Sequence, residues 1–146
     1  MKYFFPVLAL TIFSCTSHQT SSTIDLKAEE TSIRLVLQNQ VEDWNKANIE
    51  GFMQGYWKSD SILFIGSKIT HGWDSTLARY KKSYPDEATM GKLRFELMDI
   101  KFITADACLV TGKYFLTREK DSPHGIFTLL FRKKEGKWVI VYDHTS

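Results

Sequence analysis

The closing segment GKWVIVYDHTS, residues 136–146, decides the fold of this chain. It is rich in β-branched and aromatic residues, which favours a β-strand. Both alternations of that strand are apolar: Trp138, Ile140 and Tyr142 fall on one side, and Val139 and Val141 on the other. A strand at an open edge of a sheet would show a polar face to water. The segment is therefore predicted to lie inside a sheet, covered on most of both faces.

Three further runs after Gly91 also predict strands. They cover residues 92–104, 108–119 and 125–133, and the closing strand follows over 137–145. The connections are only a few residues long, so neighbouring strands are expected to be antiparallel. In the first run the apolar positions change side after Leu97, which predicts a β-bulge near Met98 or Asp99 that bends the sheet.

The first half of the chain predicts helices. Segment 25–47 has apolar residues on one face of a long helix, namely Ile33, Val36, Leu37, Val41 and Trp44. Two shorter helices are expected over 49–57 and 73–83, with a short buried strand over 62–65. Helices followed by a run of antiparallel strands are typical of an α+β domain.

The composition indicates one globular domain, predicted over residues 25–146. The chain has 146 residues, of which 43% are hydrophobic, enough to bury one core. The formal net charge is only +2 and the basic runs are short, so no nucleic-acid partner is expected.

The first residues resemble a bacterial lipoprotein signal. Lys2 precedes an apolar run that is too short to span a bilayer, and Ser14 comes directly before Cys15. The resemblance implies removal of residues 1–14, a lipid on Cys15, and residues 15–24 as a flexible tether. The protein would then be exported to the cell envelope, on the periplasmic or outer-surface side, and would meet the membrane only through its lipid. The alternative is an ordinary secretory signal that is cut slightly later.

Motifs along the whole domain resemble the nuclear transport factor 2-like superfamily, and within it the SnoaL-like and ketosteroid-isomerase-like proteins. The motifs are DWNKANIEGF (43–52), Tyr56, Asp60, His71-Gly72, GIFT (125–128) and the closing segment. The resemblance implies a cone, in which a curved, mainly antiparallel sheet wraps the long helix and an apolar pocket opens between helices and sheet. It also implies homodimers, often formed through the sheet. The closing segment is similar to that of calcium/calmodulin-dependent kinase association domains as well.

The catalytic groups of the isomerases do not carry over to this chain. The position of their general base falls near Ile65, that of their tyrosine donor near Gln40, and that of their second acid near Thr128. Gln40 and Thr128 can donate a hydrogen bond, but neither can take a proton at neutral pH. Isomerisation of the steroid type is therefore not expected.

Three other residues are candidates for acid–base chemistry: His71, Asp143 and His144. Asp143 and His144 are adjacent in a strand, so they point to opposite faces and at most one can enter the pocket. A buried carboxylate or imidazole in an apolar cone would have a shifted pKa. Alternatively, these groups bind the backbone or a dimer interface.

The expected ligand-binding residues combine aromatic rings with two polar donors: Gln40, Trp44, Tyr56, Phe64, Trp73, Tyr80, Phe127 and Thr128. The rings are equally compatible with a plain core, and Gln40 with a core residue bonded to the backbone. No cofactor and no metal are expected, because the histidines lack the spacing of metal ligands.

These residues favour a domain that binds a small, largely apolar ligand in its cone. The first alternative is an enzyme of the same fold, an isomerase, dehydratase or cyclase that uses Asp143, His144 or His71. The second alternative is an assembly domain without a ligand. An open cavity with a lone carboxylate or imidazole at its base would favour catalysis.

Overall fold

The computed structural model describes residues 25–146. The predicted signal peptide, Cys15 and the tether lie outside the described residues and stay predictions. The elements in chain order are α1 (Leu26–Asn45), α2 (Ile49–Met53), β1 (Leu63–Ile65), β2 (Ile69–His71), α3 (Trp73–Ser83), α4 (Glu87–Met90), β3 (Lys92–Thr104), β4 (Ala107–Thr117), β5 (His124–Lys134) and β6 (Lys137–Thr145).

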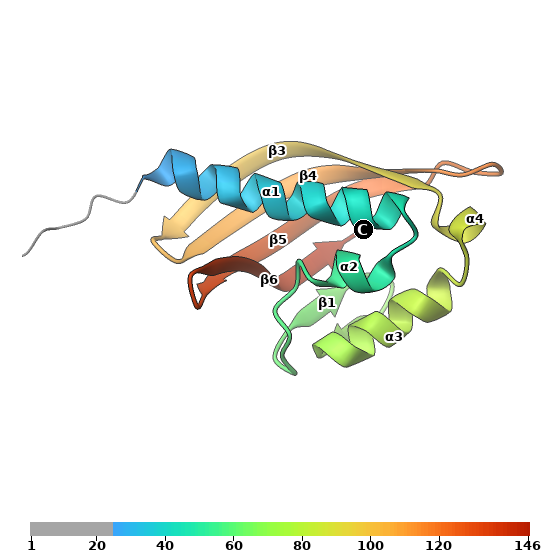
Figure 1. Cartoon of the computed structure of the whole chain (residues 1–146), viewed down its shortest axis with the longest axis horizontal. Coiled ribbons are helices and arrows are strands. Elements are labelled where there is room, and N and C mark those ends of the chain that lie inside the picture. Colours follow the sequence, from blue (N-terminus) through green and yellow to red (C-terminus); the bar gives the residue numbers. More distant parts are fainter. Residues whose placement is uncertain (1–24) are drawn as a thin grey trace, which may run out of the picture.

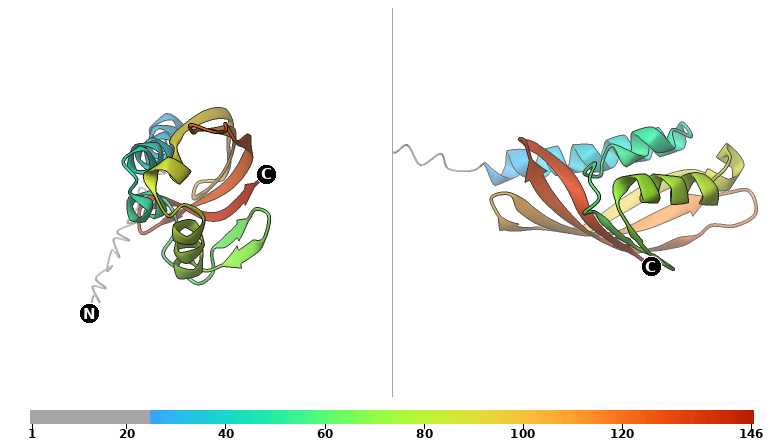
Figure 2. Two further views of the ribbon diagram at one scale, coloured as in Figure 1. Left: turned by 90° about the vertical axis from the view of Figure 1, so that its right-hand side faces the viewer. Right: turned by 90° about the horizontal axis from the view of Figure 1, so that it is seen from below.

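Six strands form one curved sheet in the order β2-β1-β6-β5-β4-β3. The long helix α1 lies along its inner face (Figure 1), and the sheet curls around this helix without closing on itself (Figure 2). All pairs are antiparallel except β1 with β6. The predicted α+β class and the mainly antiparallel curved sheet are confirmed.

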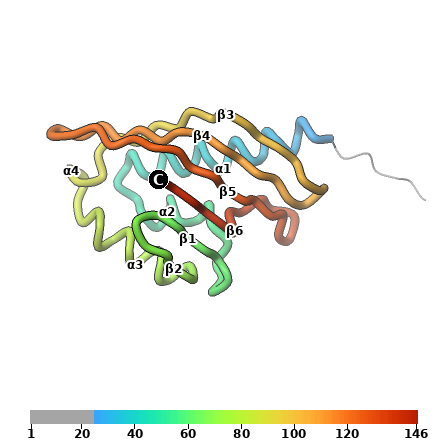
Figure 3. The backbone as a smooth tube through the Cα atoms, turned by 180° about the vertical axis from the view of Figure 1, so that it is seen from behind, coloured from blue at the N-terminus to red at the C-terminus, as the bar shows by residue number. Residues whose placement is uncertain are grey.

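Strand β6 lies inside the sheet, between β1 and β5, as its apolar sequence predicted (Figure 3). Trp138 and Ile140 are buried, with 4% and 0% of their surfaces exposed. The expectation that Tyr142 shares their side is wrong, because Tyr142 is 37% exposed. The outer face of β6 is also less covered than expected, because Val139 and Val141 are only partly buried in the single chain.

Helix α1 forms because its sequence has a cap and a single apolar face. The Asp25 side chain accepts hydrogen bonds from the backbone N–H groups of Lys27 and Ala28, which otherwise lack partners at a helix start. Its buried residues are Ile33, Leu37, Gln40 and Trp44. This face packs on the sheet, and two of its buried residues, Gln40 and Trp44, also line the cavity between helices and sheet.

Helix α2 is shorter than the predicted segment 49–57 and ends at Met53. The residues that follow pair with β6 instead of continuing the helix. The backbone oxygen of Gly55 accepts from the N–H of Ile140 at 2.9 Å, and the N–H of Trp57 donates to the Ile140 oxygen at 2.9 Å. This pairing places Tyr56 between the helices and the sheet.

The bulge predicted in β3 is present. The register with β4 shifts between Leu97 and Asp99, so Met98 is the additional residue, and 58% of its surface is exposed. The shift keeps the apolar residues on both sides of it facing α1.

Candidate functional site

A cavity of about 280 Å³ lies between the helices and the inner face of the sheet. Its floor is made of buried and mostly aromatic or aliphatic side chains, including Trp44, Phe52, Tyr56, Phe64, Phe127 and Leu129. Its rim is made of partly exposed residues, including Arg79, Tyr84, Tyr114, Arg118 and Pro123. The volume is near the small end of ligand pockets, which span about 300–1,000 Å³.

Within residues 25–146, Asp143 is the one acidic side chain that lines this cavity. It is 3% exposed. The Tyr56 hydroxyl donates to its Oδ2 at 2.6 Å, and the Thr145 hydroxyl donates to its Oδ1 at 2.7 Å. Burial raises the pKa of Asp143 to about 6, although both hydrogen bonds and the nearby charges of His144 and Arg79 act in the opposite direction. The carboxyl group therefore exchanges its proton close to neutral pH.

A β-bulge in β6 turns Asp143 into the cavity. Leu130 of β5 lies opposite Tyr142, whereas the next residue, Phe131, lies opposite Ile140, so Val141 is an additional residue in β6. Side chains of a regular strand alternate between faces, so residues three positions apart, such as Ile140 and Asp143, would lie on opposite faces of an unbulged β6. The bulge places both on the inner face.

Two tyrosines near Asp143 stay protonated. Burial is the main cause that raises the pKa of Tyr56 and of Tyr80 well above the ordinary value, and the charge of Asp143 raises both further. Neutral hydroxyls of this kind act as hydrogen-bond donors. The site thus combines donors with a single group that can accept or release a proton near pH 6.

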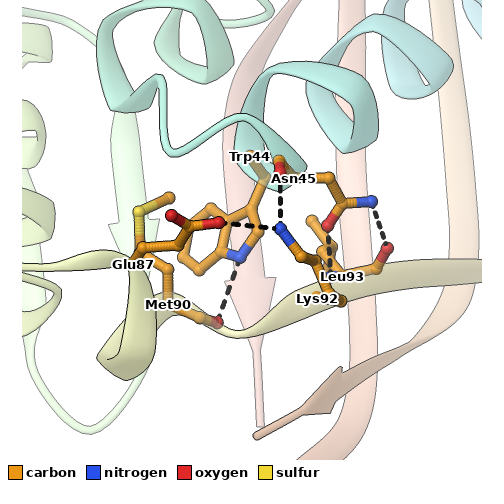
Figure 4. Close-up of polar contacts among 6 residues, drawn as sticks. All are labelled: Trp44, Asn45, Glu87, Met90, Lys92 and Leu93. Carbon is orange, nitrogen blue, oxygen red and sulfur yellow. Dashed lines mark hydrogen bonds and ion pairs between the residues drawn. The ribbon is translucent and has the colours of Figure 1, made fainter.

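The aromatic wall around Trp44 is held by contacts with α2, the end of α3 and α4. The Trp44 ring meets Phe52 and Tyr84 edge to face, at centroid distances of 5.1 and 4.8 Å. Its indole N–H donates to the Met90 oxygen at 3.2 Å (Figure 4). The Trp44 ring is therefore fixed by both ring contacts and a hydrogen bond.

Gln40 fits both of the interpretations that the sequence left open. Its Nε2 donates to the backbone oxygen of Phe52 at 3.0 Å, and the side chain also lines the cavity. Gly55 permits this packing, since a Cβ there would lie 2.7 Å from the Gln40 amide. Because that N–H bond is made, Gln40 has less capacity left for a ligand.

The structure brings most of the expected site residues together. Those that line the cavity are Gln40, Trp44, Tyr56, Phe64, Tyr80, Phe127 and Asp143. The others lie outside its lining. Trp73 is buried and donates to the Met53 oxygen at 2.9 Å, Thr128 pairs with His144 across β5 and β6, and His144 and His71 are exposed.

The sequence did not indicate the cationic residues of the rim. Arg79 was one polar residue of a helix beside Tyr80, and Arg118 stood in a charged turn-like run, TREKDSP (117–123). Neither pattern distinguishes a pocket residue from a solvated one. Among residues 25–146 no group of His, Cys, Asp or Glu has the arrangement of a metal site, and none of the helices there is both long and apolar enough to span a membrane.

Residues 33–146 match the sequence profile of the SnoaL-like domain. The chain belongs to the SnoaL-like domain family. No curated protein sequence matches it. Among solved structures, this SnoaL-like domain is similar to an NTF2-like protein of unknown function from Shewanella oneidensis MR-1, with 42% identity over 81% of this chain and 98% of the other, at a TM-score of 0.79.

More distant structures share the fold of the SnoaL-like domain. A ketosteroid isomerase-like protein from Erwinia carotovora atroseptica is 18% identical over 81% of this chain and 95% of the other, at a TM-score of 0.63. A putative calcium/calmodulin-dependent protein kinase type II association domain from Thiobacillus denitrificans is 16% identical over 77% of this chain and 92% of the other, at a TM-score of 0.65. These likenesses establish the architecture, and the chemistry has to be argued from the cavity.

Proposed function

We propose that the cavity binds a small, largely apolar molecule and that Asp143 exchanges a proton with it. The observation that carries the proposal is the buried carboxyl group on the cavity wall, with its pKa raised to about 6. A general acid or base works best when its pKa is near the working pH. The apolar floor supports binding of an apolar body, and the open cavity favours this role over that of a domain that only assembles.

The neighbours of Asp143 suit proton transfer. Tyr56 and Thr145 each donate to one carboxylate oxygen, so they fix the plane of the carboxyl group while it is charged. Each oxygen retains a lone pair that can accept a proton from a bound molecule. His144 is exposed and follows Asp143 directly, so it provides a control position outside the cavity.

The test uses 5-nitrobenzisoxazole, a flat apolar probe that reports on a carboxylate base. The base takes the proton from its C3 atom, the N–O bond breaks, and a coloured cyanonitrophenolate is released. We expect turnover by the wild-type protein to rise with pH around pH 6, as Asp143 ionises. Asp143→Asn should lower the rate by about 10²–10⁴-fold, the usual contribution of a general base, whereas His144→Ala should keep the rate of the high-pH plateau, where Asp143 is fully ionised.

Two results would contradict proton transfer by Asp143. One is an equal rate for the wild type and Asp143→Asn, and the other is no rate above that of buffer although the probe binds. Binding without turnover would restrict the function to that of a binding domain. Circular dichroism of each variant verifies that the fold is kept.

A further inference from the structure

The two ends of the cavity differ in charge. In the described part of the chain, the buried floor carries one carboxyl group, that of Asp143, whereas the rim carries two guanidinium groups, Arg79 and Arg118. Both guanidinium groups act on the same rim residue, because each lowers the pKa of Tyr84 against the larger effect of burial. The rim therefore places two cationic side chains at the entrance to an apolar chamber, with Asp121 paired to one of them, Arg118.

Arg79 is occupied by the β1–β2 hairpin. Its Nη1 donates to the Lys68 oxygen at 2.7 Å and to the Thr70 hydroxyl at 2.9 Å, and its guanidinium lies over the ring of Phe64 at 4.8 Å. Arg79 thus fastens the hairpin to α3. Arg79 contributes positive charge to the rim, but its Nη1 group is already engaged in hydrogen bonds with the hairpin.

Arg118 is held in place but keeps free donors. Its Nη1 donates to the Thr89 oxygen at 3.1 Å, and its Nε lies 2.9 Å from Oδ1 of Asp121. That N–H is not directed at the oxygen, so the buried Nε makes no hydrogen bond within residues 25–146. Nη2 makes none there either. Nε is enclosed beside the Asp121 carboxylate, so a ligand with acceptor oxygens would bind the guanidinium through its Nη2 group.

We propose that the ligand of this cavity is an amphipathic acid, whose ionised carboxylate binds Arg118 at the rim while its apolar body lies on the aromatic floor. This inference rests on the proposed function and adds the class of ligand and its direction. Arginine presents a planar fork of donors that matches the two oxygens of a carboxylate. The end of the molecule opposite to the acid group then faces Asp143.

The arrangement also explains why Arg118 is fixed before a ligand arrives. Gly91 has a φ of +65°, and a Cβ there would lie 2.5 Å from Cγ of Arg118. The glycine therefore lets the start of β3 pass directly against the arginine side chain. A guanidinium positioned in this way loses little freedom on binding, which favours affinity.

Two probes of nearly equal shape separate the charge from the apolar body: 2-naphthoate and 2-naphthamide. Calorimetric titration of the wild-type protein should give an affinity about tenfold or more higher for the acid, the size expected of a charge-assisted pair. Arg118→Gln should remove this preference, because it lowers the affinity for the acid much more than the affinity for the amide. Arg94→Gln removes the same charge at an exposed position on β3 and should retain the preference.

The outcomes distinguish the two proposals. Equal affinities of the wild type for acid and amide, or a preference that survives in Arg118→Gln, would overturn the inference and leave the binding cavity standing. Failure of both probes to bind the folded wild type would overturn the binding function itself, and the inference with it. If Arg118→Gln does not fold, the wild-type preference must still weaken as NaCl is added, because the rim is partly exposed; a salt-independent preference would contradict the inference.

Discussion

At the scale of single residues, Asp143 links the site to the stability of the fold. Its native pKa of about 6 lies above the ordinary value of 3.8, so the native state holds this proton more tightly than the unfolded chain does. The stabilisation of the native state by this bound proton is complete below about pH 4 and is lost as the pH rises through about 6. A difference of about two pKa units corresponds to roughly 3 kcal/mol.

The variant Asp143→Asn has no carboxyl group at this position, so its stability should not fall as the pH rises through about 6. We expect its free energy of unfolding, measured with urea between pH 4 and pH 7, to rise relative to the wild type by roughly 3 kcal/mol. The gain should accumulate between about pH 4 and pH 6 and then stay constant. Asp99→Asn, at an exposed position of β3, should show no such gain. Parallel pH profiles for the wild type and Asp143→Asn would contradict the raised pKa.

At the scale of elements, one side chain joins the end of α1 to the start of β3. The Asn45 amide donates to the Leu93 oxygen at 3.1 Å, and its Oδ1 accepts from the Leu93 N–H at 2.7 Å (Figure 4). Lys92 adds a bond to the Asn45 backbone oxygen at 2.8 Å and an ion pair with Glu87 at 3.0 Å. The exposed ion pair contributes little, so most of the join depends on Asn45.

Asn45→Ala should lower the free energy of unfolding by about 1–3 kcal/mol, because it leaves two backbone groups of the buried Leu93 without partners. The matched control is Asn39→Ala, which removes the same amide from an exposed position of the same helix. It should have no cost, since alanine favours a helix. Equal effects of the two substitutions in chemical denaturation would mean that the Asn45 bonds do not stabilise the fold.

The bulges at Met98 and Val141 show which parts of the elements the sequence could predict. In β3 the apolar residues change side, so the bulge at Met98 was visible. In β6 apolar residues occupy both alternations up to Tyr142, so an additional residue at Val141 changes no pattern. The sequence therefore predicted that only one of Asp143 and His144 faces the pocket, but it could not tell which. The register with β5 was needed for that.

At the scale of the whole molecule, the fold was easier to predict than the site. Long apolar patterns in α1 and β3–β6 determined the architecture, since each depends on many residues. The cavity depends on a few side chains from distant segments. Tyr56 and Asp143 are 87 residues apart in sequence and share a hydrogen bond of 2.6 Å, which no local pattern indicates. Arg118 reaches the rim only because the start of β3 passes beside it.

The outer face of the sheet is the other large-scale feature of the molecule, and we propose that it forms the homodimer interface implied by the family resemblance. Leu109, Leu130 and Tyr142 lie opposite one another on β4, β5 and β6, so they share one face. They form an apolar row on the side away from α1, where Tyr142 is 37% exposed. A row of this kind would be covered by a second copy of the sheet.

Leu130→Glu should convert the dimer into a monomer, because it would bury an unpaired charge at the centre of the interface. The control is Ile103→Glu, which introduces the same charge at an exposed apolar residue at the far end of β3 and should leave the dimer intact. Analytical ultracentrifugation at micromolar concentration measures the mass of each protein. A monomeric wild type, or a dimer that persists in Leu130→Glu, would exclude this face as the interface.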